Sequence, residues 1–430
     1  MLRVHIADEG PRAHYTIAHV VERMLGWPLL IMADRQAWER EAGPKLLYGG
    51  EPIAGAYHVP AHGLLTARGL FRGPAPVGEV GGLPVLFPLG EGSDLFAATF
   101  LLLSLNEELL PHVTDAHGRM LAMDRTLVQL GLHRTPIIDR WVLRFAERMR
   151  AMFPDLPEPR RSYRHWVTVD VDNGMRYLGR PIWRQLGAGA QEMVRGRFAD
   201  LGRRWRTLTG SGPDPYDGYA TWSGRTRAQA DRTLFFFLTR GGGRYDHATR
   251  ARHPRMASRI RELAEEHMAG LHPSYRTSEK AGLLKKEVDT WRAVAGSAPV
   301  VSRQHFLRWR LPGTLDELVA AGITEDHSLG FADRTGFVVG TSTPFRWFDP
   351  VKDREHPITL VPFAVMDSAL QDRMHLSAEE ALAEMKAMSD AVRRVNGTFV
   401  SVWHDRFLSG EGAWDAWPSV FEALLEHARA

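Results

Sequence analysis

Two aspartates one residue apart end an apolar segment, "HWVTVDVDNG" at 165–174. Residues i and i+2 of a strand point to the same side, so Asp170 and Asp172 should face one way. Two carboxylates at that spacing repel unless a cation, a proton or a ligand lies between them. One could bind a divalent metal ion while the other takes a proton from water. The alternative, a helix cap, explains one aspartate but not both.

Other polar side chains also stand where strand-like runs end. After position 163 these runs finish with ionisable or hydroxyl groups, namely His272 and Ser274, Arg303 and His305, Asp326, Asp367, and His404. In parallel β/α architectures the carboxyl ends of the strands form the active-site face. Burying so many ionisable groups would be costly in a core with only a structural role. The pattern therefore favours an enzyme.

The residue types suggest separate tasks at this edge. A neutral imidazole at His272, in "GLHPSY", suits a zinc ion, and ordinary packing of a histidine is the alternative. Arg303 could clamp the base aspartate through two hydrogen bonds, or make only a structural ion pair. His305 shares a strand face with Arg303 and could bind metal or substrate.

Proton transfer and substrate binding have further candidates. His404, in "VSVWHD", could protonate a leaving amine as a general acid, with Asp405 or Asp326 orienting its ring. The loop "RGGGRYD" at 240–246 lacks the spacing of a phosphate loop and predicts a flexible rim. The residues expected to contact substrate are Ser274, Tyr275, Asp326 and Thr341.

These residues need elements to hold them. The first third alternates strand-like and helix-like segments, from "LRVHIA" at 2–7 to the amphipathic 136–153. The proline-rich "PDLPEPRRS" at 154–162 predicts a linker. Beyond it, short apolar runs alternate with helical segments, which indicates a parallel sheet, open or closed into a barrel. We therefore expect an α/β protein with domains at 1–155 and 163–430, the second a (β/α) barrel.

Bulk composition excludes several classes of protein. Lys and Arg number 54 against 51 Asp and Glu, so the net charge of +3 gives no reason to expect a nucleic-acid partner. The basic run at 195–206 has helical spacing and predicts a solvated face. Cysteine is absent, which excludes disulfides and thiolate zinc sites and favours the cytoplasm. No stretch reaches the ~20 apolar residues of a membrane span, and the beginning of the sequence does not resemble a signal peptide.

The motifs, in this order, resemble the NodB-type polysaccharide deacetylases, also called carbohydrate esterase family 4. More closely they resemble an uncharacterised bacterial branch with an extra N-terminal α/β domain. The resemblance rests on segments throughout the chain, including "GPKLLYGGEPI", "SDLFAATFLLLSLNEELLPH", "VDVDN", "GLHPSY", "SRQHFLRW", "GITEDHSLGFAD", "PFAVMD" and "GTFVSVWHD". It implies a distorted (β/α) barrel, a divalent metal ion that is usually zinc, and hydrolysis of an N-acetyl group on an amino sugar or sometimes an O-acetyl ester.

The resemblance also implies a metal site, with two departures from the family pattern. Asp172 would be a metal ligand, but Val171 separates it from the other aspartate where the family has an adjacent pair. His272 matches the first of two metal-binding histidines, and Arg276 stands where the second would be. An arginine cannot bind a cation, so His305 is the expected third ligand.

Three catalytic roles follow from the same resemblance. Asp170 would be the base, Arg303 would hold it, and His404 would be the acid. We expect a cytoplasmic, metal-dependent hydrolase that deacetylates an amino sugar or a surface-polysaccharide precursor. Hydrolysis of another ester or amide, and carbohydrate binding without catalysis, are the alternatives.

The N-terminal domain, with His58, His62 and Asp94, gives no reason to prefer a site over packing. Covering the barrel mouth, binding the substrate and forming a homodimer are its open roles.

Overall fold

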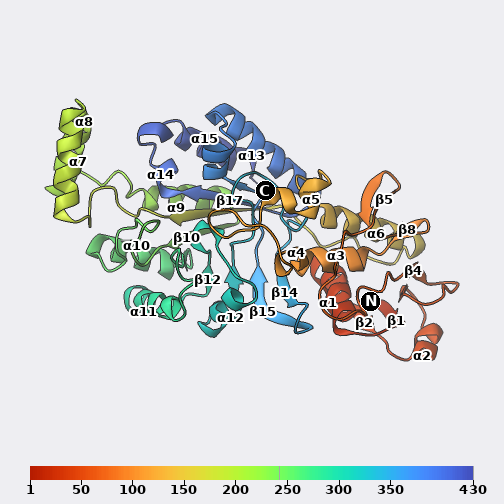
Figure 1. Ribbon diagram of the computed structural model, residues 1–430. Helices are drawn as coiled ribbons and strands as arrows, with labels where there is room; N and C mark the ends of the chain where they lie inside the picture. The colour runs from red at the N-terminus through yellow and green to blue at the C-terminus, as the bar shows by residue number, and fades with distance from the viewer. Residues whose placement is uncertain (242, 430) are drawn as a thin grey trace. The chain divides into compact units, whose positions relative to one another are not determined.

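The computed structural model describes residues 1–241 and 243–429, which divide into two compact units (Figure 1). Unit 1 comprises Met1–Tyr163, Gly336–Pro362 and Asp390–Thr398, and unit 2 comprises Arg164–Thr335, Phe363–Ser389 and the chain from Phe399 onward. The sequence had assigned 336–362 and 390–398 to the C-terminal domain. The division of the chain into two domains at 1–155 and 163–430 stays a sequence-based prediction. None of the described helices is both long enough and apolar enough to cross a lipid bilayer.

Unit 1 contains a parallel sheet with the strand order β2-β1-β3-β4. The expected helix at 136–153 is confirmed as α6 (Ile137–Met152), whose Ile138, Val142, Phe145 and Met149 are buried at helical spacing. The strands and helices of this unit are β1 (Leu2–Ile6), α1 (Pro11–Ala18), the π-helix η1 (His19–Met24), β2 (Leu29–Ile31), α2 (Arg35–Arg40), β3 (Lys45–Tyr48), β4 (Tyr57–Val59), β5 (Val77–Val80), β6 (Leu83–Leu86), β7 (Pro88–Leu89), β8 (Gly92–Ser93), α3 (Leu95–Leu103), α4 (Asn106–Leu109), the 3-10 helix η2 (Ala122–Asp124), α5 (Thr126–Gln129) and α6.

A hairpin from later in the chain completes unit 1. Strands β14 (Phe345–Asp349) and β15 (Arg354–Leu360) pair in antiparallel fashion. The hydroxyl of Tyr15, on α1, donates to the carbonyl of Arg346 at 2.6 Å, and the indole N–H of Trp347 donates to the carbonyl of Ser104 at 3.0 Å. These hydrogen bonds, one of them buried, explain why the hairpin belongs to unit 1 although the intervening chain folds elsewhere.

Unit 2 is built around a sheet in which its strands lie in the order β13-β12-β11-β10-β9-β17-β16. The pairs from β9 to β13 and the pair β16–β17 are parallel. The strands are β9 (Arg164–Val171), β10 (Arg232–Phe237), β11 (Ala269–Leu271), β12 (Val301–Ser302), β13 (Glu325–Asp326), β16 (Val365–Met366) and β17 (Thr398–His404). Among the described residues the strand order does not close on itself, which is consistent with a distorted and incomplete barrel.

Helices lie between these strands and after the last of them, as the alternating sequence pattern predicted. They are α7 (Ile182–Val194), α8 (Phe198–Leu208), α9 (Tyr219–Gln229), α10 (Pro254–Glu265), α11 (Leu283–Ala295), the 3-10 helix η3 (His305–Leu307), α12 (Gly313–Ala320), the π-helix η4 (Ala369–Arg373), α13 (Ala378–Arg393), α14 (Asp405–Leu408), the 3-10 helix η5 (Gly412–Trp414) and α15 (Trp417–His427). Because neighbouring strands run in one direction, their carboxyl ends meet at one edge of the sheet.

Close packing beside the site depends on a glycine in β11. A Cβ on Gly270 would lie 2.7 Å from the ring of Phe236 and 2.7 Å from a methyl group of Val301. Both neighbours are buried and belong, with Leu234, to one hydrophobic cluster. A larger residue would therefore push β10 and β12 away from β11.

We expect Gly270→Ala to lower the free energy of unfolding by about 1–3 kcal/mol, because the packed side chains must move. Gly224→Ala is the matched control, since Gly224 lies in α9 with open space around its Cβ position. It should be neutral or stabilising by up to ~1 kcal/mol, because alanine favours helix. Chemical denaturation of both variants checks this, and equal stabilities would contradict the packing argument.

Candidate metal and catalytic site

The two aspartates of the opening motif lie at the carboxyl end of β9. Asp170 is the penultimate residue of the strand, and Asp172 follows it in a bend. The side chain of Asp170 is 4% exposed and that of Asp172 is 15% exposed. Buried carboxylates are costly unless they are paired, so their neighbours define the chemistry of the site.

Two histidines face Asp172. The Nε2 atoms of His272 and His305 each lie 3.4 Å from its Oδ1. One ligand atom from each of the three residues can be chosen so that all lie within 4.8 Å of one another. Oδ1 of Asp172 is buried and has no hydrogen-bond partner among the described residues. Two imidazoles and a carboxylate around an unsatisfied oxygen form a donor set that fits a zinc ion.

Hydrogen bonds on the far side of each ring point the Nε2 atoms at Asp172. Nδ1 of His272 donates to the backbone carbonyl of Arg303. Nδ1 of His305 donates to the carboxylate of Asp246 at 2.9 Å. Such outer partners fix the tautomer of a metal-binding histidine and leave Nε2 as the coordinating atom.

Neighbouring charges shift the pKa values of His305 and Asp172 in this buried cluster. Burial lowers the pKa of His305, but Asp172 and Asp246 outweigh it and raise this pKa to about 9. Burial raises the pKa of Asp172, and the charge of His305 together with His272 and His404 holds it well below its usual range. An imidazolium therefore neutralises Asp172 when no other cation does so.

Asp170 is held by a buried arginine. Nη1 of Arg303 donates to Oδ1 of Asp170 at 2.8 Å, and Nη2 donates to the hydroxyl of Thr168 at 2.9 Å. Nε donates to the carbonyl of His327 at 2.9 Å, so three donors of the guanidinium are satisfied. Oδ2 of Asp170 lies 3.9 Å from Nε2 of His272. The arginine therefore holds one oxygen while the other faces the histidine cluster.

His404 enters the site from the end of β17. Its Nε2 lies 3.7 Å from Oδ2 of Asp172, and its Nδ1 pairs with Oδ1 of Asp367 at 2.5 Å. Oδ2 of Asp367 also accepts the backbone N–H of His404 at 2.7 Å. Burial lowers the pKa of His404, but the charge of Asp367 outweighs it and the pKa is raised.

The orienting carboxylate of His404 was predicted incorrectly. Asp405 instead accepts the backbone N–H groups of Asn173 and Gly174 at 3.0 and 2.7 Å, and so holds the loop after Asp172. Asp326 accepts the hydroxyl of Ser302 at 2.6 Å and is buried. Asp405 thus fixes a loop, whereas Asp326 links β13 to β12. Asp367 takes the orienting role because β16 lies beside β17 in the sheet.

The residues expected to contact substrate are mostly engaged within the protein. Ser274 donates its hydroxyl and its backbone N–H to the buried Glu287. Thr341 belongs to unit 1, where its hydroxyl donates to Asp139 at 2.6 Å. The ring of Tyr275 packs against the ring of Tyr245, with centroids 4.2 Å apart. Substrate contact by these residues and by Asp326 stays a prediction.

Two charged residues of the site were not predicted. Asp246, which orients His305, lies in the loop that was interpreted as a flexible rim, of which Gly242 is outside the described residues. Its backbone partner is Tyr275, whose N–H donates to it at 3.0 Å. Nη1 of Arg406 lies 3.4 Å from Oδ2 of Asp172. The position of Arg406 two residues after His404, the polar end of β17, was the available signal.

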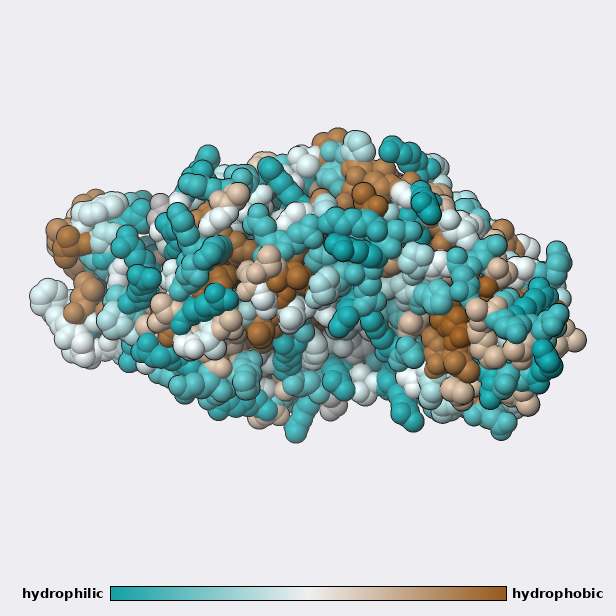
Figure 2. All heavy atoms as spheres, turned by 90° about the horizontal axis from the view of Figure 1, so that it is seen from below, coloured by the Kyte–Doolittle hydropathy of each residue, from teal (hydrophilic) through white to brown (hydrophobic). Residues whose placement is uncertain are grey.

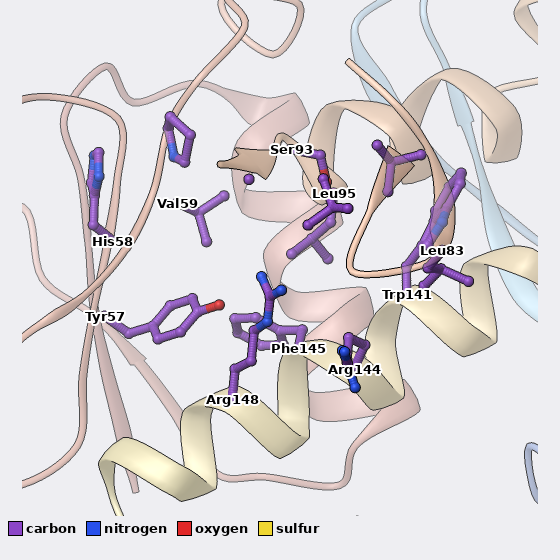
Figure 3. A pocket seen from close by; sticks show the side chains of 14 residues that line it. Tyr57, His58, Val59, Leu83, Ser93, Leu95, Trp141, Arg144, Phe145 and Arg148 are labelled. Carbon is purple, nitrogen blue, oxygen red and sulfur yellow. The ribbon is translucent and has the colours of Figure 1, made fainter. Parts of the chain in front are cut away.

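Unit 1 has a pocket of its own, of about 130 Å³ (Figure 3). Tyr57, His58, Phe145 and two arginines of α6, Arg144 and Arg148, are among its lining residues. No carboxylate lines it, so it does not offer the donor set seen in unit 2.

The Asp94 side chain has a structural role in unit 1. Asp94 caps α3, because its Oδ1 accepts the backbone N–H of Ala97 at 2.8 Å. Its Oδ2 accepts the backbone N–H of His62 at 2.8 Å and the hydroxyl of Tyr48 at 2.9 Å. Both oxygens are therefore satisfied inside unit 1.

One family model matches the N-terminal part of the chain. Residues 2–154 match the model of DUF7033, a family of unknown function. No curated protein matches the chain.

Solved structures with low similarity include two polysaccharide deacetylases. A putative polysaccharide deacetylase from Mycobacterium smegmatis is 18% identical with a TM-score of 0.39, over 62% of this chain and 82% of that one. A polysaccharide deacetylase from Bacillus cereus is 12% identical with a TM-score of 0.29, over 62% and 88%. A GH57 branching enzyme from Thermococcus kodakaraensis is 10% identical with a TM-score of 0.31, over 62% and 68%. At such low scores, function must be argued from the site.

Without metal, the protein should lose stability as the pH rises from about 6.5 to 9. The pKa of His305 is raised to about 9 in the folded state, against ~6.5 when unfolded. The stabilisation is complete below the unfolded value and is lost above the folded one, a change of order 1–3 kcal/mol.

Thermal unfolding in chelator should show this trend for the wild type and a weaker one for His305→Asn. A difference between the two proteins that does not depend on pH would contradict the assignment of the raised pKa to His305.

Proposed function

We propose that unit 2 is a metal-dependent hydrolase that removes an N-acetyl group from an amino sugar, such as a surface-polysaccharide precursor. The observation that carries the proposal is the convergence of Asp172, His272 and His305 around an unsatisfied carboxylate oxygen. The motif resemblance to NodB-type deacetylases supports the choice of substrate. The parallel sheet of unit 2 supports the distorted-barrel fold that this resemblance implies.

The three residues would hold a divalent ion, with zinc as the first choice because it favours imidazole and carboxylate ligands. When bound, such an ion supplies Lewis-acid chemistry by polarising a carbonyl and lowering the pKa of water. Asp172 is the better ligand of the two aspartates, because its Oδ1 faces both histidines while Oδ1 of Asp170 is engaged by Arg303. His305 takes the place of the histidine that Arg276 replaces in the motif.

Asp170 would be the general base. Arg303 fixes the carboxylate, so its free oxygen can take a proton from the water that attacks the acetyl carbonyl. A new C–O bond then forms at the carbonyl carbon. Because Arg303 is fully buried and bonded at three donors, the base is held in one orientation before substrate arrives.

His404 would be the general acid. Its raised pKa favours the protonated ring, and Asp367 holds Nδ1 so that the proton to be transferred lies on Nε2. Nε2 gives that proton to the amide nitrogen as the C–N bond breaks. The products are acetate and the free amine of the sugar.

Carbohydrate binding without catalysis is the weaker alternative. It was motivated by the arginine at the position of the second metal-binding histidine. Nε2 of His305 lies 3.4 Å from Oδ1 of Asp172. A second histidine is therefore present at the carboxylate despite the arginine, which favours the hydrolase. Hydrolysis of another ester or amide would use the same residues. Only assays with different substrates distinguish it from deacetylation of an amino sugar.

The proposed activity is measured as acetate released from N-acetylglucosamine oligomers, beside a panel of acetyl esters. We expect chelator and Asp172→Ala each to reduce the rate at least roughly 100-fold, because the ligand set is broken. The control Asp289→Asn removes an exposed carboxylate on α11 and should retain full activity. Full activity after chelation, or in Asp172→Ala, would overturn the mechanism, and cleavage of esters alone would change the substrate.

Metal affinity should increase with pH. A histidine must lose its proton before it binds a metal ion, and the pKa of His305 is about 9 in the metal-free protein. The apparent affinity for Zn²⁺ should therefore rise about tenfold per pH unit from about 6.5 to 9. Competition with a chromophoric chelator measures this slope, and an affinity that does not vary with pH would exclude His305 as a ligand.

A further inference from the structure

Helices α7 and α8 form a hairpin between β9 and β10 that projects away from the sheet of unit 2 (Figure 1). The usual distribution of side chains is reversed in this hairpin. The buried residues are Gln185, Gly189 and Glu192 on α7, and Asp200 and Thr207 on α8. Polar groups and a glycine, rather than apolar side chains, therefore fill the inside of the hairpin.

An ion-pair network explains how the polar interior is stable. Arg204 donates to both oxygens of Glu192 at 2.9 and 2.6 Å and also donates to Gln185. Asp200 is paired with Arg203 and Arg197. Both buried carboxylates are thus neutralised by arginines, as burial of charge requires.

The same network ties the hairpin to the loop after the candidate site. Gln185 donates to the carbonyl of Tyr177, and the guanidinium of Arg204 lies 4.6 Å from the centre of the Tyr177 ring. These contacts attach the hairpin to the rest of unit 2.

That outer face is apolar. On α7 the exposed residues include Trp183 at 65% and Val194 at 87%, and on α8 Trp205 is 70% exposed. Helical spacing places these side chains on one face of each helix. The whole exposed set is Ile182, Trp183, Leu186, Met193, Val194, Phe198, Trp205 and Leu208. Figure 2 shows hydrophobic residues gathered at the end of unit 2 where this hairpin lies. A soluble domain rarely exposes so many large apolar side chains on one element unless they bind something.

The exposed charge around this face is positive. Glu192 and Asp200 are the only acidic residues at 181–212, and both are buried. Arg184, Arg195 and Arg206 are exposed, and the guanidinium of Arg184 lies 5.0 Å from the centre of the Trp183 ring. A basic helical surface that also carries tryptophan and aliphatic side chains is typical of binding to a membrane interface.

We propose that the α7–α8 hairpin binds the surface of an anionic lipid bilayer. The apolar side chains would enter the boundary between headgroups and acyl chains, and the arginines would contact lipid phosphates. Aliphatic residues such as Ile182 and Val194 gain little from a polysaccharide, which stacks on aromatic rings. Two copies of the hairpin would bring arginines of the same charge together. The proposal does not depend on the proposed hydrolase activity.

Co-sedimentation of the full chain with vesicles tests the proposal. The vesicles are mixed phosphatidylglycerol and phosphatidylcholine, or phosphatidylcholine alone. We expect binding to the anionic vesicles that weakens as salt rises from about 50 mM to about 500 mM, because salt screens the arginines. This salt series uses the wild-type protein and does not depend on any variant folding.

Two sets of substitutions separate the apolar and the electrostatic contributions. Trp183→Ser/Phe198→Ser/Trp205→Ser should weaken binding at least roughly 10-fold, because large apolar side chains leave the interface. Arg184→Gln/Arg195→Gln/Arg206→Gln should weaken it roughly 100-fold at low salt, about fivefold for each arginine. The matched control Val113→Ser/Val300→Ser/Val351→Ser changes exposed apolar residues outside the hairpin and should bind as the wild type does.

Three outcomes would overturn the proposal. The first is no binding of the wild type to anionic vesicles at low salt. The second is vesicle binding that neither hairpin variant weakens, with circular dichroism confirming that both variants are folded. The third is self-association or polysaccharide binding that the hairpin variants abolish while vesicles are not bound, which would assign this face to a second copy or to a glycan.

Discussion

The organisation of unit 2 depends on compensation of buried negative charge. Three carboxylates near the end of β9 have specific donors: Arg303 for Asp170, the loop amides after Asp172 for Asp405, and the His404 ring and amide for Asp367. Asp172 differs, because its Oδ1 faces only imidazole nitrogens at 3.4 Å. Since the other three carboxylates have such donors, Asp172 is the carboxylate that most needs a nearby cation.

The parallel sheet allows these charged residues to gather without disrupting the apolar core. Strands β9 to β13 run in one direction, so polar residues that are distant in the chain meet at one edge without entering the apolar core. Below that edge, side chains such as Phe235 and Phe236 exclude water from the sheet. Gly270 permits the close approach of neighbouring strands. The rigid core thereby holds the charged groups at separations that side-chain flexibility alone would not maintain.

In the α7–α8 hairpin the positions of charged and apolar side chains are the reverse of those in the sheet. There, arginine–carboxylate pairs occupy the inside and apolar side chains face outward. The basic run at 195–206 was expected to form a solvated face, and Arg195 and Arg206 are exposed, whereas Arg204 pairs with the buried Glu192 inside the hairpin. Helical periodicity defines two faces of a helix, and only the contacts of the folded chain determine which of them is covered.

The sequence by itself determined the main elements and the composition of the site edge. Alternating apolar runs predicted strands such as β9 and β17, and periodicity of 3.6 predicted helices such as α6 and α13. Only the tertiary structure decided the pairing of charges. Asp367 and not Asp405 orients His404, and Asp246 lies 59 residues before the histidine that it orients. Local patterns record which face of an element is apolar, whereas hydrogen-bond partners depend on which strands and loops become neighbours in space.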